Sequence, residues 1–333
     1  MKNAQVCFIV FMNLQQLIDT SKQTGLLDVS GMGLTTLPAL PKTLTHLMCE
    51  RNQLTCLPFL PETLTKLNCG YNQLTSLPVL PTMLQTLWCY HNLLTNLPML
   101  PETLEEIKCF TNQLVRLPAL PESLTKLHCQ INSLATLPAL PRNLDILVCE
   151  SNRLLTLPSL PETLTRLICD RNPLTHLPVL PNKLTYLNCE SARLTILPSL
   201  PETLTQLACT NNQLTRLPVL PNNLFYLNCA HNQLTTLPPI PDKLAYLYCQ
   251  DNHFVKPFPN LTSSEHREVR IRNIQQYYRR KAEARSTLAL QQTLANTLTE
   301  DCLHTIGTFL SGQKGTLSMQ IEDMKRLLQM VIL

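Results

Sequence analysis

The chain has 333 residues, of which 44% are hydrophobic, 5% aromatic and 15% charged, and its formal net charge is +4. It contains only 7 glycines, which excludes a collagen, and its apolar content is too high for a disordered protein. The longest uninterrupted apolar run, residues 6–12, is shorter than the roughly 20 residues that a membrane-spanning helix requires.

Residues 1–23 precede the repeats and are predicted to be an N-terminal cap or a start-site extension. Both interpretations stay open, because Met12 is as suitable a start as Met1. The apolar run is short for a signal-peptide core and no A-x-A-like cleavage site follows it, so no cleaved leader is expected.

Residues 24–252 repeat with a period of 20 residues. The unit reads P-x-x-L-x-x-L-x-C-x-x-N-x-L-x-x-L-P-x-L, which is the leucine-rich-repeat pattern with cysteine in the third apolar slot. Cysteine recurs from Cys49 to Cys249, and asparagine from Asn52 to Asn252 with one interruption at Ala192. Twelve copies are counted, the first of which is degenerate and carries Val29 in the cysteine slot.

Each unit is predicted to contribute one strand to a parallel sheet. In the copy at residues 61–80, alternation directs Leu67 and Cys69 inward and directs Lys66, Asn68 and Gly70 outward. Stacking of successive copies would then build a solenoid with this sheet on its concave face.

The remaining slots are assigned to the turn, the core and the convex side. Asn72 is expected to turn the chain, to tolerate the turn geometry and to bond backbone groups, so that stacked copies form an asparagine ladder. Leu74, Leu77 and Leu80 are expected to fill the core. Pro61 and Pro78 disfavour helix, so the convex side is predicted to be extended or polyproline-like.

On these motifs, residues 24–252 resemble the short, proline-rich leucine-rich repeats of bacterial effectors of the YopM and IpaH type. The shared pattern is L-P-x-L-P-x-x-L-x-x-L-x-[apolar]-x-x-N-x-L. The resemblance implies a leucine-rich-repeat solenoid in an effector-like protein. IpaH-type effectors also carry a ubiquitin-ligase domain with a catalytic cysteine in a C-x-D motif. Here Cys302 is followed by Leu303 and His304, so that activity is not carried over.

Eleven of the 14 cysteines form the ladder. Parallel, in-register stacking does not suit the dihedral angle of a disulfide, and eleven thiols cannot pair completely. We therefore expect small, buried, free thiols, and a reducing, intracellular compartment.

No C-x-x-C pair, P-loop, G-x-G-x-x-G or G-x-S-x-G motif is present, and the eight histidines are scattered. The sequence therefore predicts no metal, no cofactor and no enzymatic activity.

The outward strand positions vary from copy to copy, whereas the skeleton does not, so the concave face is the predicted recognition surface. Exposed tyrosine and tryptophan are typical binding anchors. A first group of candidate binding residues comprises Tyr71, Trp88, Tyr90, His91, Lys108, Phe110 and His128. A second group comprises Tyr186, Tyr226, Tyr246 and Tyr248. Two alternatives stay open: both groups are ordinary solvent-facing strand residues, or the second packs against the tail.

Residues 253–263 are predicted to be a linker, and residues 264–333 an α-helical module that begins with a helix over 264–296. The segment 267–285 is rich in arginine, so contact with nucleic acid or an anionic membrane is a further interpretation beside a solvated helix face. Ile274 and Gln275 partly resemble a calmodulin-binding IQ motif. A simple helical cap on the solenoid is the other alternative.

The segment Leu298–Leu310 loosely resembles the opening of an F-box, with Leu303, Ile306 and Leu310 on its apolar slots. This resemblance implies docking to an adaptor of a cullin-type ubiquitin ligase. The predicted function is thus non-enzymatic binding of a partner protein on the concave face. The alternative is a substrate receptor for such a ligase. For an exported effector or a viral protein, the expected compartment is the cytoplasm of a host cell.

Overall fold

The structure is a computed structural model that describes residues 14–255, 274, 276–280, 283 and 285–286. Contacts divide the chain into two units, Met1–Arg270 and Ile271–Leu333. The described residues of the second unit are helical, with Ile274 buried and Arg279 and Arg280 exposed. The rest of that helix and the F-box-like segment lie outside the described residues.

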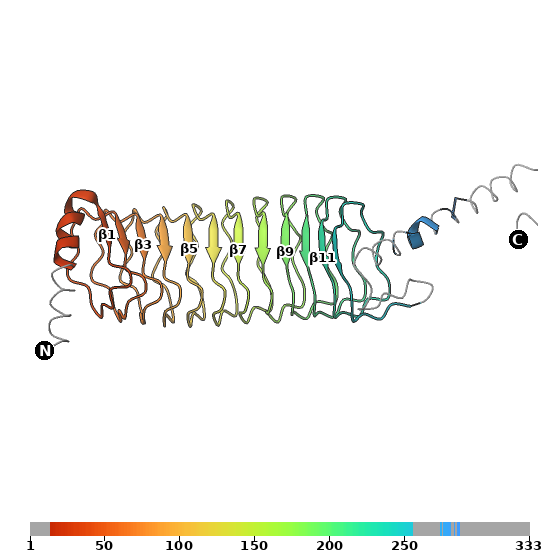
Figure 1. Cartoon of the computed structure of the whole chain (residues 1–333), viewed down its shortest axis with the longest axis horizontal. Coiled ribbons are helices and arrows are strands. Elements are labelled where there is room, and N and C mark those ends of the chain that lie inside the picture. Colours follow the sequence, from red (N-terminus) through yellow and green to blue (C-terminus); the bar gives the residue numbers. More distant parts are fainter. Residues whose placement is uncertain (1–13, 256–273, 275, 281–282, 284, 287–333) are drawn as a thin grey trace, which may run out of the picture. The chain divides into compact units, whose positions relative to one another are not determined.

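The first unit is a solenoid whose strands form one parallel sheet in sequence order, with each strand paired to the strand 20 residues further along the chain (Figure 1). The strands are β1 (Leu26–Asp28), β2 (His46–Met48), β3 (Lys66–Asn68), β4 (Thr86–Trp88), β5 (Glu106–Lys108), β6 (Lys126–His128), β7 (Ile146–Val148), β8 (Arg166–Ile168), β9 (Tyr186–Asn188), β10 (Gln206–Ala208), β11 (Tyr226–Asn228) and β12 (Tyr246–Tyr248). The predicted fold class is therefore confirmed.

The core is a stack of leucines and cysteines. Leu67 and Cys69 are fully buried, and the same holds for their equivalents in the other coils, including Val29 in the first. The last leucine of the unit fills the core less evenly than predicted, since Leu80 is buried but Leu60 and Leu100 are only half-buried.

The asparagine ladder is present, and the hydrogen bonds and the left-handed backbone of each turn are supplied by two adjacent residues. The Asn72 side chain accepts a hydrogen bond from the Leu54 N–H at 3.0 Å and donates to the carbonyls of Cys49 (3.0 Å) and Cys69 (3.1 Å). The left-handed turn residue is the one before it, Tyr71 (φ 50°); its equivalents from Arg51 to Asp251 have φ between 49° and 55°, and Gly31 takes this position in the first coil with φ 70°. The predicted asparagine ladder that bonds backbone groups of the turn is therefore confirmed, and the left-handed position belongs to the residue before each asparagine.

Residues 14–24 form a helix that leads into β1, with Leu14 and Ile18 buried. The chain leaves this helix through Gly25, whose φ is +72° and whose N–H donates to the Ser21 carbonyl at 2.8 Å. A Cβ at this glycine would lie 2.8 Å from Thr45 Oγ1, so the junction requires glycine. From residue 26 to residue 255 no segment is helical, which agrees with the predicted extended convex side.

Candidate functional site

The candidate site is the sheet face, by which we mean the solvent-facing side of β1–β12 together with the turn residues that follow each strand. The parallel register aligns residues 20 positions apart in columns, such as Asn68, Trp88 and Lys108. The predicted binding residues of the two groups all lie on this face or in its turns. A partner would therefore meet columns of side chains that run across the strands.

Four side chains of the first group form an interlocked set of rings, which we call the aromatic cluster. Tyr71 stacks on His91 with ring centroids 4.2 Å apart, and Tyr90 stacks on Phe110 at 4.7 Å. The two stacks meet edge to face, with Tyr71 and Tyr90 at 5.5 Å. Such pairs stabilise one another beyond simple burial, so the cluster is a preorganised surface.

Tyr90 is held in place by residues that were not among the predicted binding residues. A Cβ on Gly70 would lie 2.7 Å from the Tyr90 ring, so only glycine lets the ring lie across this coil. The Tyr90 hydroxyl then donates to Glu50 Oε2 at 2.8 Å, two coils away, and Asn68 donates to the same oxygen at 2.7 Å. Burial and the Glu50 carboxylate raise the pKa of Tyr90 to about 12, so its hydroxyl remains a donor. Asn68 and Gly70 face outward as predicted, yet both are buried.

Trp88 lies between two lysines. The ammonium groups of Lys66 and Lys108 are 4.5 and 4.1 Å from its ring centroid, and Lys108 also pairs with Glu106 at 3.0 Å. Trp88 Nε1 is buried and has no hydrogen-bond partner among the described residues. The indole is thus fixed by cation–π contacts and keeps an unused donor.

His128 lies beside Lys108 in the same column. Burial lowers its pKa, the positive charges of Lys108, Lys126 and Arg166 lower it further, and Glu106 acts in the opposite direction. The imidazole therefore lies in a positive potential built by side chains from three strands.

The structure divides the second group. Tyr226 contacts Tyr246 and Tyr248 at centroid distances of 6.2 and 5.8 Å, and Phe225, which the sequence analysis missed, contacts Tyr246 at 5.3 Å. Tyr186 contacts a cation instead, because the Arg166 guanidinium lies 4.2 Å from its ring centroid.

Between the two groups lies a column of carboxylates, Glu150, Asp170 and Glu190, in the turns after β7, β8 and β9. Asp170 accepts a hydrogen bond from Asn188 at 3.0 Å, and Glu190 accepts one from Asn228 at 3.1 Å. Burial raises the pKa of all three acids. Comparing the same slot in three consecutive units would have revealed this column from the sequence.

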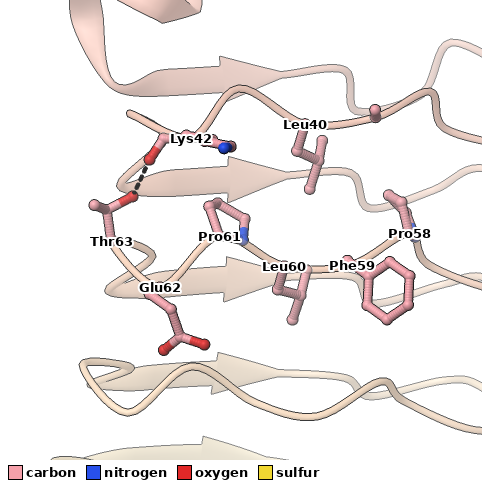
Figure 2. A pocket seen from close by; sticks show the side chains of 9 residues that line it. Leu40, Lys42, Pro58, Phe59, Leu60, Pro61, Glu62 and Thr63 are labelled. Carbon is pink, nitrogen blue, oxygen red and sulfur yellow. Dashed lines mark hydrogen bonds between the residues drawn. The ribbon is translucent and has the colours of Figure 1, made fainter.

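A separate pocket of about 480 Å³ lies between the proline-rich segments of the first coils (Figure 2). Leu40, Phe59 and Leu60 provide apolar lining, and the Thr63 hydroxyl donates to the Lys42 carbonyl at 2.9 Å beside it. Phe59 is 95% exposed. No predicted site residue lines this pocket.

Eleven ladder cysteines are free and buried, and Cys56 is free and exposed, as the prediction of unpaired thiols requires. In the part of the chain that the structure describes, no three His, Cys, Asp or Glu side chains are placed to hold a metal ion. No helix in that part has both the length and the apolar character needed to cross a membrane. The predicted adaptor-docking residues Leu303, Ile306 and Leu310 lie outside it.

Comparison with known proteins identifies the fold family. No protein-family model matches the chain, and no curated protein matches it either. Among solved structures, YopM from Yersinia enterocolitica is 34% identical with a TM-score of 0.63, and the match covers 72% of this chain and 58% of YopM. YopM from Yersinia pestis, described as a leucine-rich effector protein, is 30% identical with a TM-score of 0.50, and the match covers 75% of this chain and 90% of that one.

InlJ from Listeria monocytogenes is 26% identical with a TM-score of 0.50, over 68% of this chain and 63% of that one. Its described functional domain includes a cysteine ladder, as this chain does. The chain spans somewhat more than half the length of the Yersinia enterocolitica protein. The period, the parallel sheet and these similarities together show that the chain belongs to the family of leucine-rich-repeat proteins that includes YopM.

Proposed function

We propose that this protein binds a partner protein on its sheet face and has no enzymatic activity of its own. The aromatic cluster carries the proposal, because it presents stacked rings on a surface whose strands repeat in register from coil to coil. A rigid platform of this kind loses little conformational entropy when a partner binds. Similarity to a described effector protein supports an effector-like role.

Trp88 is the proposed central anchor, with Tyr90 and Phe110 beside it. We expect Trp88→Ala to weaken partner binding by about 2 kcal/mol or more, because tryptophan anchors dominate interface energies. The measurement is quantitative mass spectrometry of proteins captured from a eukaryotic lysate by the full chain and by the variant, with thermal unfolding as a check on folding.

Phe59→Ala is the matched control, since it removes another aromatic side chain, which is 95% exposed and lies outside the sheet. Proteins retained by this variant but lost by Trp88→Ala support the sheet face. An unchanged set of captured proteins with Trp88→Ala contradicts the role of Trp88, and a loss with Phe59→Ala alone would move binding to the pocket in Figure 2.

The second candidate is a substrate receptor for a cullin-type ubiquitin ligase. Its support is the pattern of Leu303, Ile306 and Leu310 in the sequence. The test is the double variant Leu303→Asp/Ile306→Asp in the full chain. Loss of ligase components with retained target binding supports the receptor, whereas capture of the same proteins by both forms excludes adaptor docking at these residues.

We also propose a reducing, intracellular compartment, and the cytoplasm of a host cell for an exported protein. The ladder thiols are shielded by burial, so the redox argument rests on Cys56, whose thiol is free and exposed.

A further inference from the structure

We propose that the partner is held through an acidic polypeptide segment, which binds the basic side chains on strands β3–β8. These are Lys66, Lys108, Lys126 and Arg166, here called the basic patch. The inference rests on the proposed function and adds the chemistry of the partner to it.

The register of the sheet places the members of the basic patch in two neighbouring columns, and Glu106 stands in one of them between Lys66 and Lys126. Lys66, Lys126 and Arg166 occupy the first position of their strands and lie in one column, and Lys108 lies in the neighbouring column beside Trp88. Lys108 pairs with Glu106. Among the described residues, no carboxylate lies within ion-pair distance of Lys66, Lys126 or Arg166. Three of the four cations therefore have no carboxylate partner there, and of these Lys66 and Arg166 contact the rings of Trp88 and Tyr186, so their charges remain open to a bound carboxylate.

His128 lies beside Lys108 within the patch, and its pKa responds to the charges around it. Apart from burial, the lowering of its pKa comes from Lys108, Lys126 and Arg166, which outweigh the opposing Glu106. A carboxylate bound among these cations would favour the protonated imidazole. Binding of an acidic segment should therefore raise the pKa of His128.

The dimensions of the patch fit a short peptide. Strands lie about 4.8 Å apart, so the five spacings from β3 to β8 span about 24 Å. An extended segment of eight residues spans about 27 Å. A segment that crosses the strands can thus contact all four cations without leaving the sheet face.

The sign of the charge changes next to the patch, and this favours a polypeptide over a nucleic acid. Glu150, Asp170 and Glu190 follow β7–β9 on the same face. A nucleic acid carries a negative charge at every phosphate and would be repelled where it crosses these acids. A protein segment can be acidic where it contacts the basic patch and neutral or basic where it passes the three carboxylates.

The test uses a fluorescein-labelled octaglutamate peptide, its octaglutamine counterpart and the full chain, with fluorescence anisotropy at low and high salt. We expect the glutamate peptide to bind at low salt and the double variant Lys66→Gln/Lys126→Gln to weaken it at least about tenfold. The control Arg116→Gln/Arg216→Gln removes two cations that are exposed outside the sheet, and should bind as the unchanged protein does. In NMR titrations, the peptide should raise the pKa of His128.

Equal binding of the two peptides, equal weakening by both double variants, or tighter binding of octauridylate than of octaglutamate would overturn the inference. If octaglutamate fails to bind while Trp88→Ala still abolishes partner capture, this inference is wrong and the proposed function stands. If octaglutamate fails to bind and Trp88→Ala leaves partner capture unchanged, this inference and the proposed function are both wrong.

Discussion

Single asparagine side chains connect neighbouring coils. Asn152 accepts a hydrogen bond from the Leu134 N–H at 3.0 Å and donates to the carbonyls of Cys129 and Cys149, each at 3.1 Å. These backbone groups point into the turn and have no strand partner. One side chain therefore satisfies groups from two coils, which is why the same residue type returns every 20 positions.

We expect Asn152→Ala to lower the free energy of unfolding by about 3 kcal/mol, because it leaves buried backbone groups without partners. Ala192 is the natural interruption of the ladder, so the reverse change, Ala192→Asn, should raise stability by about 1 kcal/mol. Urea denaturation of the two variants measures both effects. A stabilising Asn152→Ala, or a destabilising Ala192→Asn, would contradict this account of the ladder.

At the scale of the element, each strand from β2 to β12 is followed by an inward cysteine, and these cysteines recur every 20 residues. Burial raises the pKa of Cys49 and Cys109 to about 12 and raises the pKa of the ladder thiols between them as well. The thiols stay protonated in the folded protein while those of the unfolded chain ionise near the ordinary value of 9.0. The contribution of the buried thiols to the free energy of unfolding is therefore fully present below about pH 9 and is lost as the pH rises toward 12.

This predicts a steep loss of stability above pH 9, of about 1.4 kcal/mol per ladder thiol for each pH unit. Urea denaturation at a series of pH values measures the slope. The double variant Cys129→Ala/Cys149→Ala has two fewer titrating groups and should give a shallower slope, whatever its stability at pH 7. Equal slopes in the two proteins would show that the ladder is not the cause.

At the scale of the whole solenoid, each strand pairs only with the strands next to it in the chain, and contacts that reach two coils away, such as Tyr90 to Glu50, are side-chain contacts. Stability is then a sum of coil and neighbour terms, and one complete period is the unit that can be removed. Deletion of residues 141–160, which contain β7, rejoins Leu140 to Pro161 and restores the repeat. We expect this protein to fold, with a melting temperature lowered by a few degrees.

Deletion of residues 141–150 is the control, because a half period places the wrong residue types in the cysteine and asparagine slots. Circular dichroism and thermal unfolding compare the two deletions. Loss of cooperative unfolding in the full-period deletion would mean that the coils depend on contacts beyond their nearest neighbours.

The sequence by itself determined the architecture. The 20-residue period of Leu67, Cys69 and Asn72 predicts the parallel sheet, its register, the buried thiols and the extended convex side. This is possible because each position of the repeat has one physical role that recurs from coil to coil. It also placed the candidate binding residues on one face, since side-chain direction in a strand follows from alternation.

Only the tertiary structure decided how those side chains meet. The contact of Tyr90 with Glu50 joins residues 40 positions apart, and it depends on the space above Gly70 and on the chosen rotamer. Likewise, the two lysines around Trp88 are brought together by stacking. A local pattern specifies the backbone because it repeats, whereas the surface chemistry arises from contacts between non-repeating residues of different coils.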